Sequence, residues 1–250
     1  MNIGVIPARL ASKRLPNKIL ADIHGKPMII HTAERAIKAK QLERVILAID
    51  SEKTENALKN YDFEMIMTSK NHTSGTDRVA EIARNIPEAE VILNIQADEP
   101  LIDPDIIDAI VRTFENKEVK MSTVVSTKLT VSDLLNPNVV KVIIDERKKA
   151  LTFKRNIFDI EIGGVYRHIG IYGFCRETLL RFTMLSPTPR EIKNNLEQLR
   201  ALDNDISIHS VISSHQYYSV DTQDDLDNLS TIFNDSSKII NVENQNIERD

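Results

Sequence analysis

The stretch Ile3-Gly4-Val5-Ile6-Pro7-Ala8-Arg9 opens the chain with a short apolar run that ends in a charged residue. A run of this length is typical of a buried strand, and no basic leader precedes it. We therefore expect a first strand at Ile3–Ile6 rather than a signal peptide. The loop that follows contains four cations, Arg9, Lys13, Arg14 and Lys18. In a parallel sheet this loop lies at the carboxyl ends of the strands, where ligands bind.

The first half of the chain alternates apolar runs with amphipathic segments. The pattern predicts strands at Arg44–Ile49, Phe63–Met67 and Val91–Ile95, and helices at Pro27–Ala39, Ser51–Lys59, Thr76–Asn85 and from Asp103-Pro104 onward. Ser51 is a natural N-cap, and Asp103 precedes a proline suited to the first helical position. This β-α-β-α order favours an α/β fold in which helices cover a parallel sheet.

The second half of the chain follows a different pattern. Strands are expected at Met121–Thr127, Val139–Ile144, Ala150–Phe153 and Tyr166–Phe174, without long helices between them. We therefore expect one domain of residues 1–233, with a smaller mixed or antiparallel lobe over about residues 121–185. Residues 1–120 and about 186–233 would form the main part. It would end with a helix at Pro189–Leu202, a strand at Ile206–Ile212 and a helix from Thr222 to about Phe233. Residues 234–250 are polar and expected to fray.

The composition argues against several classes of protein. The 250 residues include 32 Lys and Arg against 37 Asp and Glu, a net charge of −5, which disfavours nucleic-acid binding. The seven glycines do not spell a dinucleotide fingerprint or a P-loop. The one cysteine, Cys175, excludes an intrachain disulfide and a cysteine zinc site. No apolar stretch approaches the roughly 18 residues of a membrane span. We expect a soluble cytoplasmic protein that binds neither nucleic acid nor membrane.

The basic loop after the first strand needs a compensating anion or full solvation. A triphosphate suits it, because guanidinium groups form paired hydrogen bonds with phosphate oxygens. A solvated surface loop is the alternative. Because the loop lies directly after the first strand of an α/β sheet, the two interpretations, a phosphate site and a solvated loop, have equal weight.

Seven motifs along the chain resemble those of sugar nucleotidyltransferases that make CMP-activated acid sugars. The resemblance is strongest to the 3-deoxy-manno-octulosonate (Kdo) cytidylyltransferase family, also called CMP-Kdo synthetases. The motifs are Pro7-Ala8-Arg9 through Lys18, His24-Gly25-Lys26-Pro27-Met28-Ile29, Thr73-Ser74-Gly75-Thr76-Asp77-Arg78, Asn94-Ile95-Gln96-Ala97-Asp98-Glu99-Pro100, Arg167-His168-Ile169-Gly170-Ile171-Tyr172-Gly173-Phe174, Leu196-Glu197-Gln198-Leu199-Arg200 and Val220-Asp221-Thr222. One motif alone is weak, but seven in the same order are specific. The resemblance implies a Rossmann-like nucleotidyltransferase sheet flanked by helices, with the smaller lobe used for homodimerisation.

Two aspartates stand where the resemblance implies a Mg²⁺ site. Asp98 follows a strand and has no helix to cap, since Asp103 caps the next one. Asp221 follows a late strand, and either it or Thr222 could cap the last helix, with Asp225 completing a capping box. The resemblance implies that Asp98 and Asp221 hold Mg²⁺ against a triphosphate. Mg²⁺ is commonly held by one or two carboxylates together with phosphates, so the pair suits it.

The resemblance also assigns residues to a nucleotide site and a sugar site. For CTP it implies Ala8, Arg9, Arg14, Lys18, Ser74, Gly75, Thr76, Arg78 and Gln96, and for the acid sugar Arg155, His168, Tyr172, Glu197 and Gln198. Arg9 and Lys18 would act in catalysis beside the two aspartates. The residues alone allow other roles. Thr76 can cap a helix, Arg78 can lie on its surface, and His168 and Tyr172 can pack from one face of a strand. Glu197 can pair with Arg200 as an i,i+3 neighbour.

The implied reaction is nucleotidyl transfer. The anomeric hydroxyl of Kdo or a close variant attacks the α-phosphorus of CTP, and pyrophosphate leaves, giving the CMP-sugar for lipopolysaccharide synthesis. Three alternatives remain open. They are CMP-activation of 8-amino-Kdo or a nonulosonic acid such as sialic acid, a pyrophosphorylase acting on a sugar 1-phosphate, and a non-catalytic nucleotide-binding relative.

The chain departs from the family pattern in three places. At Lys154-Arg155-Asn156-Ile157-Phe158-Asp159, lysine replaces a serine, and a proline and a second arginine are absent. This departure bears on the identity of the sugar more than on the chemistry. Ala97 and Asn17 each replace a glycine, and asparagine tolerates the left-handed backbone that a glycine would adopt.

Overall fold

The computed structural model describes residues 1–12, 14–156 and 164–233 of the chain. Its strands are β1 (Asn2–Ala8), β2 (Asp22–Ile23), β3 (Lys26–Pro27), β4 (Arg44–Ile49), β5 (Glu64–Met67), β6 (Val91–Asn94), β7 (Met121–Ser126), β8 (Lys141–Ile144), β9 (Ala150–Lys154), β10 (Val165–Cys175) and β11 (Ile208–Ser213). Its helices are the 3₁₀ turn η1 (Lys18–Leu20), α1 (Met28–Ala36), α2 (Glu52–Leu58), α3 (Gly75–Asn85), α4 (Pro104–Thr113), α5 (Val131–Leu135), α6 (Arg176–Met184), α7 (Pro189–Asn194) and α8 (Leu199–Asp203). Residues 223–233 form a further helix. The predicted tail at 234–250 lies outside the described residues.

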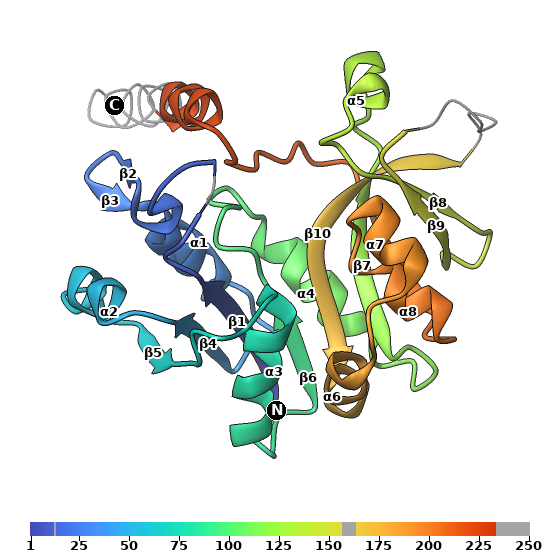
Figure 1. Cartoon of the computed structure of the whole chain (residues 1–250), viewed down its shortest axis with the longest axis horizontal. Coiled ribbons are helices and arrows are strands. Elements are labelled where there is room, and N and C mark those ends of the chain that lie inside the picture. The colour runs from blue at the N-terminus through green and yellow to red at the C-terminus, as the bar shows by residue number, and fades with distance from the viewer. Residues whose placement is uncertain (13, 157–163, 234–250) are drawn as a thin grey trace, which may run out of the picture.

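A nine-stranded sheet crosses the centre of the molecule, with helices on both of its faces (Figure 1). The strand order is β11-β7-β10-β6-β1-β4-β5, and β8 and β9 continue from β10. β1 pairs in parallel with β4 and β6, and β4 pairs in parallel with β5. The predicted parallel strands of the first half are therefore confirmed, and the carboxyl ends of β1 and β6 meet at one edge, where ligands bind in α/β sheets.

The strands of the second half extend the same sheet with mixed directions. β10 runs antiparallel to β6, β7 and β8, while β11 lies parallel to β7. β10 is the longest strand, with 11 residues, and its register against β7 shifts between Ile169 and Tyr172. Strands β7 to β10 fall within about residues 121–185, which the sequence analysis assigned to the smaller lobe. The fold confirms an α/β class with a central sheet flanked by helices, and the division into a main part and a smaller lobe stays a prediction.

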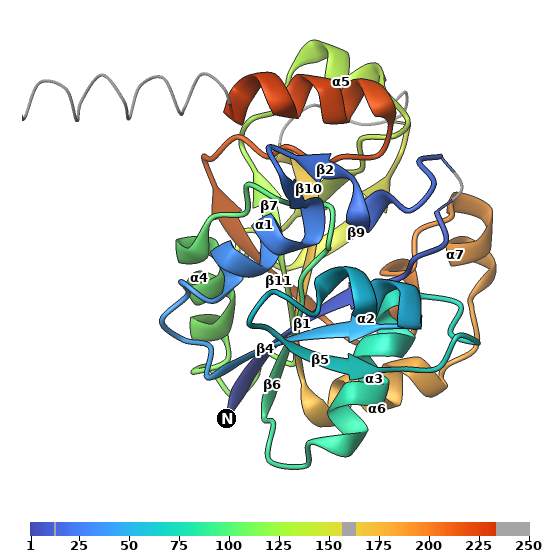
Figure 2. The same ribbon diagram turned by 90° about the vertical axis from the view of Figure 1, so that its left-hand side faces the viewer.

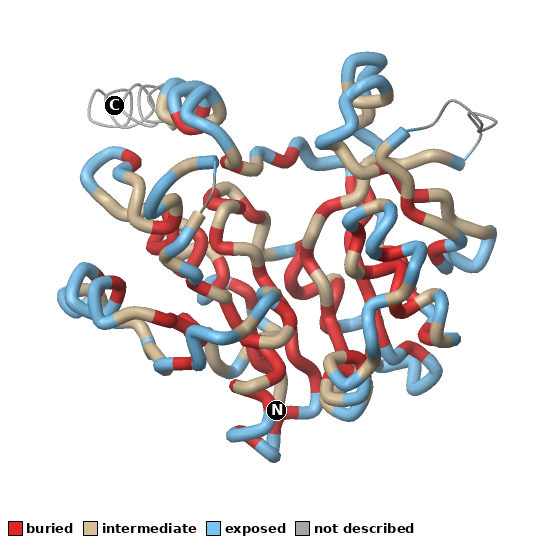
Figure 3. The backbone as a smooth tube through the Cα atoms, viewed as in Figure 1, coloured by how far each residue is buried: buried red, intermediate tan, exposed pale blue. Residues whose placement is uncertain are grey.

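Two apolar cores cover the two faces of the sheet. On one face α1 and α4 pack against alternate residues of the strands, as with Ile29, Ile107 and Leu93. On the other face α3, α6 and α8 pack against the remaining residues, such as Val79 and Ile92. The central strands lie between these cores and are buried, as Figure 3 shows. Burial on both faces explains why these strands have continuous apolar runs.

The last helix is fixed to the opposite end of the chain. Leu226 and Leu229 share a small core with Ile23 of β2 and Met28 of α1. In Figure 2 this helix lies above the β2–β3 ribbon. The segment before it passes the end of β6, where the Val220 amide donates to the Asp98 carbonyl at 3.1 Å. This crossing carries Asp221 to the sheet edge. Within the described residues, no helix combines the length and apolar character that crossing a bilayer requires.

Three helices differ from the prediction. The expected helix at Pro189–Leu202 is wrong, because Asn195 adopts the left-handed conformation (φ 51°) and ends α7, so that α8 begins only at Leu199. Asparagine tolerates this conformation and commonly ends helices. The short α5 and the nine-residue α6 were not expected. The predicted caps at Ser51 and Asp103 are confirmed, since each side chain accepts a backbone N–H two residues on.

The close packing of α4 on β10 predicts a large cost for one added methyl group. A Cβ at Gly173 would lie 2.7 Å from Ile110 Cγ2 and 2.8 Å from Phe114 Cε2, which is closer than real contacts. We expect Gly173→Ala to lower the free energy of unfolding by about 1–3 kcal/mol, as overpacking does. Gly170→Ala on the same strand is the matched control, because its Cβ would meet only Gln96 Cγ at 3.8 Å. Urea unfolding measures both. Equal stability of the two variants would contradict this packing.

Candidate active site

Two adjoining cavities open at the sheet edge where β1 and β6 end. The larger has a volume of about 670 Å³ and the smaller about 240 Å³. Gln96 and Asp98, which follow β6, line both of them. The two cavities therefore meet at residues that the sequence predicts for the nucleotide and the metal.

The smaller cavity gathers most of the predicted nucleotide residues. Its lining includes Arg9, Lys18, Ser74, Gly75, Arg78 and Gln96. Three others lie elsewhere. Ala8 and Thr76 are buried, and Arg14 lines the larger cavity. Arg9 is exposed at the mouth, and its guanidinium has no hydrogen bond or ion pair to any other described residue.

The larger cavity gathers all five predicted sugar residues, Arg155, His168, Tyr172, Glu197 and Gln198. They come from three parts of the fold. Arg155 follows β9, His168 and Tyr172 belong to β10, and Glu197 and Gln198 lie in the link between α7 and α8. The break at Asn195 that ends α7 creates this link. A continuous helix would not have presented the two residues in the same way.

Lys18 stands between the two predicted metal ligands. Its ammonium lies 2.5 Å from Asp98 Oδ2 and 3.1 Å from Asp221 Oδ1. Arg14 lies 2.8 Å from the same Asp221 oxygen. Burial lowers the pKa of Lys18, but the charges and hydrogen bonds of both aspartates outweigh this and raise it above the ordinary lysine value. The lysine is therefore charged at neutral pH.

Local backbone structure helps to bring the side chains of Lys18 and Asp221 together. Asn17 adopts the left-handed conformation (φ 54°) that the sequence led us to expect, and it turns the loop so that Lys18 starts η1. Thr222 and Asp225 form the capping box of the last helix, with Asp225 N–H donating to Thr222 Oγ1 at 3.2 Å. Asp221 is therefore not needed as the cap, and its carboxylate faces Lys18.

The donor set of Asp98 and Asp221 fits a hard divalent cation. Two carboxylates converge on one positively charged atom at the mouth of a cavity lined by further cations. In the described part of the chain, no three His, Cys, Asp or Glu side chains are placed to hold a metal by themselves. Mg²⁺ suits this arrangement, because it commonly takes one or two carboxylates and completes its shell with phosphate and water.

Sequence reasoning missed Glu99, which is buried beside this centre and lines the larger cavity. Burial raises its pKa to about 8, and the negative charge of Asp98 adds to the rise, against an opposing effect of Arg167. Arg167 lines the same cavity and was not among the predicted site residues either. Both residues lie in the quoted motifs, but nothing in the sequence shows that they face each other across the fold.

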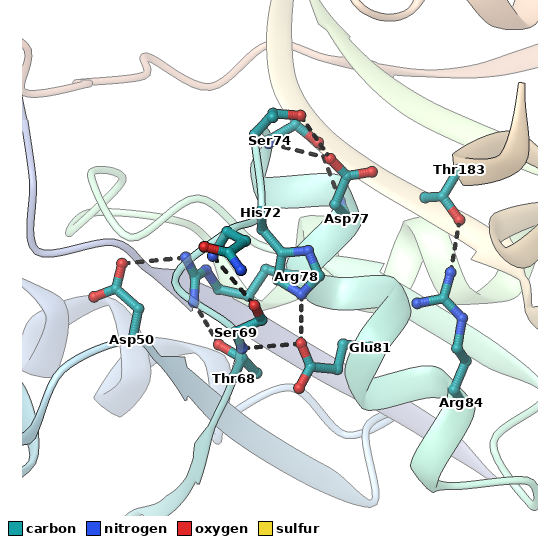
Figure 4. A network of polar contacts seen from close by, with 12 residues as sticks. Asp50, Thr68, Ser69, His72, Ser74, Asp77, Arg78, Glu81, Arg84 and Thr183 are labelled. Atoms are coloured by element: carbon teal, nitrogen blue, oxygen red, sulfur yellow. Dashed lines mark hydrogen bonds and ion pairs between the residues drawn. The ribbon is translucent and has the colours of Figure 1, made fainter. Parts of the chain in front are cut away.

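Arg78 has a structural role that the sequence did not suggest. It is 1% exposed, so the interpretation as a surface residue of the helix is wrong. Its guanidinium donates to Asp50 Oδ2 at 3.1 Å and to Thr68 Oγ1, as Figure 4 shows. Asp50 Oδ1 in turn accepts the Leu10 amide of the basic loop at 3.1 Å. Arg78 thus anchors the floor of the smaller cavity. The cap of α3 is Ser74, not Thr76.

Arg155 and Lys141 brace the walls of the larger cavity. The three guanidinium nitrogens of Arg155 donate to the carbonyls of Pro137, Asn194 and Asn195 at 3.0–3.1 Å. The buried Lys141 ammonium donates to three carbonyls of residues 133–139, a segment that also lines the cavity. Arg155 therefore joins two walls, and three of its five N–H donors are engaged by backbone carbonyls.

Comparisons with known proteins agree with this geometry. The sequence model described as cytidylyltransferase matches residues 3–208. The chain belongs to the cytidylyltransferase family. A relative from Geobacter sulfurreducens, named 3-deoxy-manno-octulosonate cytidylyltransferase, is 42% identical over 244 residues, covering 91% of this chain and 97% of that protein. A relative of the same name from Fusobacterium nucleatum is 40% identical, covering 90% of this chain and 94% of that protein.

Solved structures extend the likeness of this cytidylyltransferase. A CMP:2-keto-3-deoxy-manno-octonic acid synthetase complexed with CTP is 31% identical and superposes with a TM-score of 0.88, covering 94% of this chain and 100% of that one. A cytidylyltransferase from Leptospira borgpetersenii superposes with a TM-score of 0.64 at 17% identity, which shows a common fold only. The predicted resemblance to the CMP-Kdo synthetase family is confirmed.

His168 of this cytidylyltransferase is a neutral group. Burial lowers its pKa to about 3. Its ring lies 5.0 Å from the Phe153 ring, and Nε2 lies 3.1 Å from Thr123 Oγ1. Because that hydroxyl donates to the Ile171 carbonyl at 2.8 Å, it accepts from Nε2–H, which leaves Nδ1 as an acceptor. His168 therefore lines the larger cavity as a neutral ring with Nδ1 as an acceptor.

The lowered pKa of His168 predicts part of the acid sensitivity of the fold. Between pH 6.5 and about 3 the unfolded chain binds a proton on this residue that the folded chain does not. Its stabilising contribution is thus complete above pH 6.5 and is lost as the pH falls. We expect His168→Gln to reduce the slope of unfolding free energy against pH in this range, by at most about 1.4 kcal/mol per unit.

The measurement is urea unfolding at a series of pH values. His24→Gln, at an exposed histidine, is measured alongside to show the effect of the same substitution outside the cavity. If His168→Gln unfolds with the slope of the unsubstituted protein, His168 is protonated in the folded state and the assignment fails.

Proposed function

We propose that this chain transfers the cytidylyl group of CTP to the anomeric hydroxyl of Kdo or a close variant, with release of pyrophosphate. The observation that carries the proposal is the convergence of Lys18, Asp98 and Asp221 where the two cavities meet. The names of the relatives and the CTP complex of the similar synthetase support the same reaction.

The charge distribution supports one substrate in each cavity. The smaller cavity has Arg9 and Lys18 for the triphosphate, and hydroxyl and backbone groups at Ser74 and Gly75. The larger cavity combines neutral hydrogen-bonding groups such as those of Tyr172 and Gln198 with charged side chains such as Arg167. Such groups suit the hydroxyls of an eight-carbon sugar acid.

We propose that Asp98 and Asp221 hold Mg²⁺ when CTP is bound. The ion would neutralise triphosphate charge and make the attacking hydroxyl more acidic. With the triphosphate and the cation present, the Lys18 ammonium would pair with phosphate oxygens, as Arg9 and Arg14 would. These cations balance the charge of the departing pyrophosphate.

The reaction requires positioning more than covalent chemistry. The anomeric oxygen forms a bond to the α-phosphorus, the bond from that phosphorus to the pyrophosphate oxygen breaks, and the hydroxyl proton leaves. The residues of the larger cavity hold the hydroxyl, and those of the smaller cavity hold the phosphorus, so the two meet beside Asp98. Fixed orientation of two reactants accounts for a large part of such a rate enhancement.

The acid sugar is the less determined substrate. The departure from the family pattern at Lys154–Asp159 falls partly outside the described residues, and Arg155 is engaged by backbone carbonyls. An 8-amino-Kdo therefore stands beside Kdo as a candidate acceptor. A homodimer and a cytoplasmic location also stay proposals.

Pyrophosphate release tests the proposed function. Purified protein with Mg²⁺ is supplied with CTP, UTP, ATP or GTP, each paired with Kdo, 8-amino-Kdo or sialic acid. We expect release with CTP and an octulosonate, and at least tenfold less with the other nucleotides or with sialic acid. If no pair releases pyrophosphate and the folded protein does not bind CTP, the proposal is refuted.

A further inference from the structure

Thr76 lies behind the nucleotide loop rather than in it. It is 3% exposed, while its neighbours Ser74 and Gly75 line the smaller cavity. Its hydroxyl donates to Glu197 Oε2 at 2.5 Å and accepts from Asn94 Nδ2 at 3.4 Å. Both hydrogen-bonding directions of the hydroxyl are thus used inside the protein. A nucleotide in the cavity would find the donor hydrogen of the Thr76 hydroxyl already engaged by Glu197.

The bond to Glu197 crosses from one cavity to the other. Thr76 is the second residue of α3, whereas Glu197 lies in the link between α7 and α8, 121 residues further along the chain. On the nucleotide side the contacts continue from Asn94 to Gln96, whose Nε2 donates to Asn94 Oδ1 at 3.1 Å. A row of polar contacts therefore connects the shared residue Gln96 with a carboxylate of the larger cavity.

Glu197 has few groups to fix its orientation. Its side chain is 31% exposed and lines the larger cavity. The nearest cation, Arg200, lies 3.8 Å away and already holds Glu191 with two hydrogen bonds. Burial raises the pKa of Glu197, and hydrogen bonds from Thr76 and Ser74 counteract the rise. The hydroxyls at the start of α3 thus oppose the rise in pKa and orient the carboxylate.

We propose that Thr76 is a positioning residue for the acid sugar, and that its hydroxyl fixes the Glu197 carboxylate so that the free oxygen faces the sugar hydroxyls. The inference rests on the proposed function. It moves Thr76 from the nucleotide, where the sequence motif had put it, to the second substrate. It also means that the start of α3 serves both substrates, through Ser74 and Gly75 on one side and Thr76 on the other.

Two substitutions at position 76 test the inference. Thr76→Val keeps the shape and removes the hydroxyl, and Thr76→Ser keeps the hydroxyl. We expect Thr76→Val to raise KM for the sugar about tenfold, the effect of losing one hydrogen bond to a charged group, with KM for CTP within about twofold. Thr76→Ser should restore KM for the sugar to within about threefold of the unsubstituted value. A rise in KM for CTP alone, or no change in either KM, would overturn the inference.

A double-mutant cycle separates positioning from a structural effect. In the Glu197→Ala background, Thr76→Val should change KM for the sugar by less than about twofold, because the oxygen that accepts the Thr76 hydroxyl is gone. A second tenfold rise there would show that Thr76 acts independently of Glu197. Thermal unfolding checks each variant, and Thr76→Ala replaces Thr76→Val if the valine does not fold.

Failure of the proposed function is distinguishable from failure of this inference. If the unsubstituted protein releases no pyrophosphate from CTP with any acid sugar, the proposed function fails. If it does so and the Thr76 variants show unchanged KM for the sugar, only the role of Thr76 fails.

Discussion

The Lys18 ammonium, held between Asp98 and Asp221, joins three distant parts of the chain at one point. It brings the loop after β1, the end of β6 and the segment before the last helix to the same sheet edge. A salt bridge in such a place is weak evidence for stability, because the desolvation of three charges offsets much of their attraction. The contact of Lys18 with the two aspartates is better explained by a role in function than by a contribution to stability. The lysine keeps two carboxylates close together, in the place where a triphosphate and its cation would be bound.

The sheet determines how the second substrate reaches this point. β10 pairs with β6 at one end and with β8 at the other, so it connects the parallel strands of the first half with the part of the fold that carries the larger cavity. Its register shift between Ile169 and Tyr172 lies where the strand lines that cavity. The link after α7 closes the cavity from the opposite side with Glu197 and Gln198. The two cavities share Gln96 and Asp98, and their other lining residues differ.

Local signals in the sequence predicted the elements of this arrangement well. The strands of the first half, the caps at Ser51 and Asp103 and the left-handed Asn17 depend on neighbouring residues, and all are confirmed. The helix at Pro189–Leu202 failed because its apolar spacing continues through Asn195, although the backbone turns there. The periodicity of apolar residues does not reveal a single residue in the left-handed conformation.

The roles of individual side chains were harder to predict than their place. Most of the predicted residues line one of the two cavities, yet Arg78, Arg155 and Thr76 form hydrogen bonds with protein partners. Each of those partners is at least ten residues away in sequence, so no spacing rule connects them. Glu99 and Arg167 were missed for the same reason. A motif indicates where a side chain lies, and the long-range contacts decide what it can still bind.

The most direct test of the central claim is the position of a bound metal. Crystals grown with CTP and Mn²⁺, a close stand-in for Mg²⁺, would be measured by anomalous diffraction, with Asp98→Asn crystals and the exposed Asp62→Asn as controls. Our account predicts an anomalous peak touching Asp98, Asp221 and the triphosphate in the unsubstituted protein and in Asp62→Asn, and its loss or weakening in Asp98→Asn. A peak on the triphosphate away from both aspartates, with Lys18 still held between them, would contradict the account.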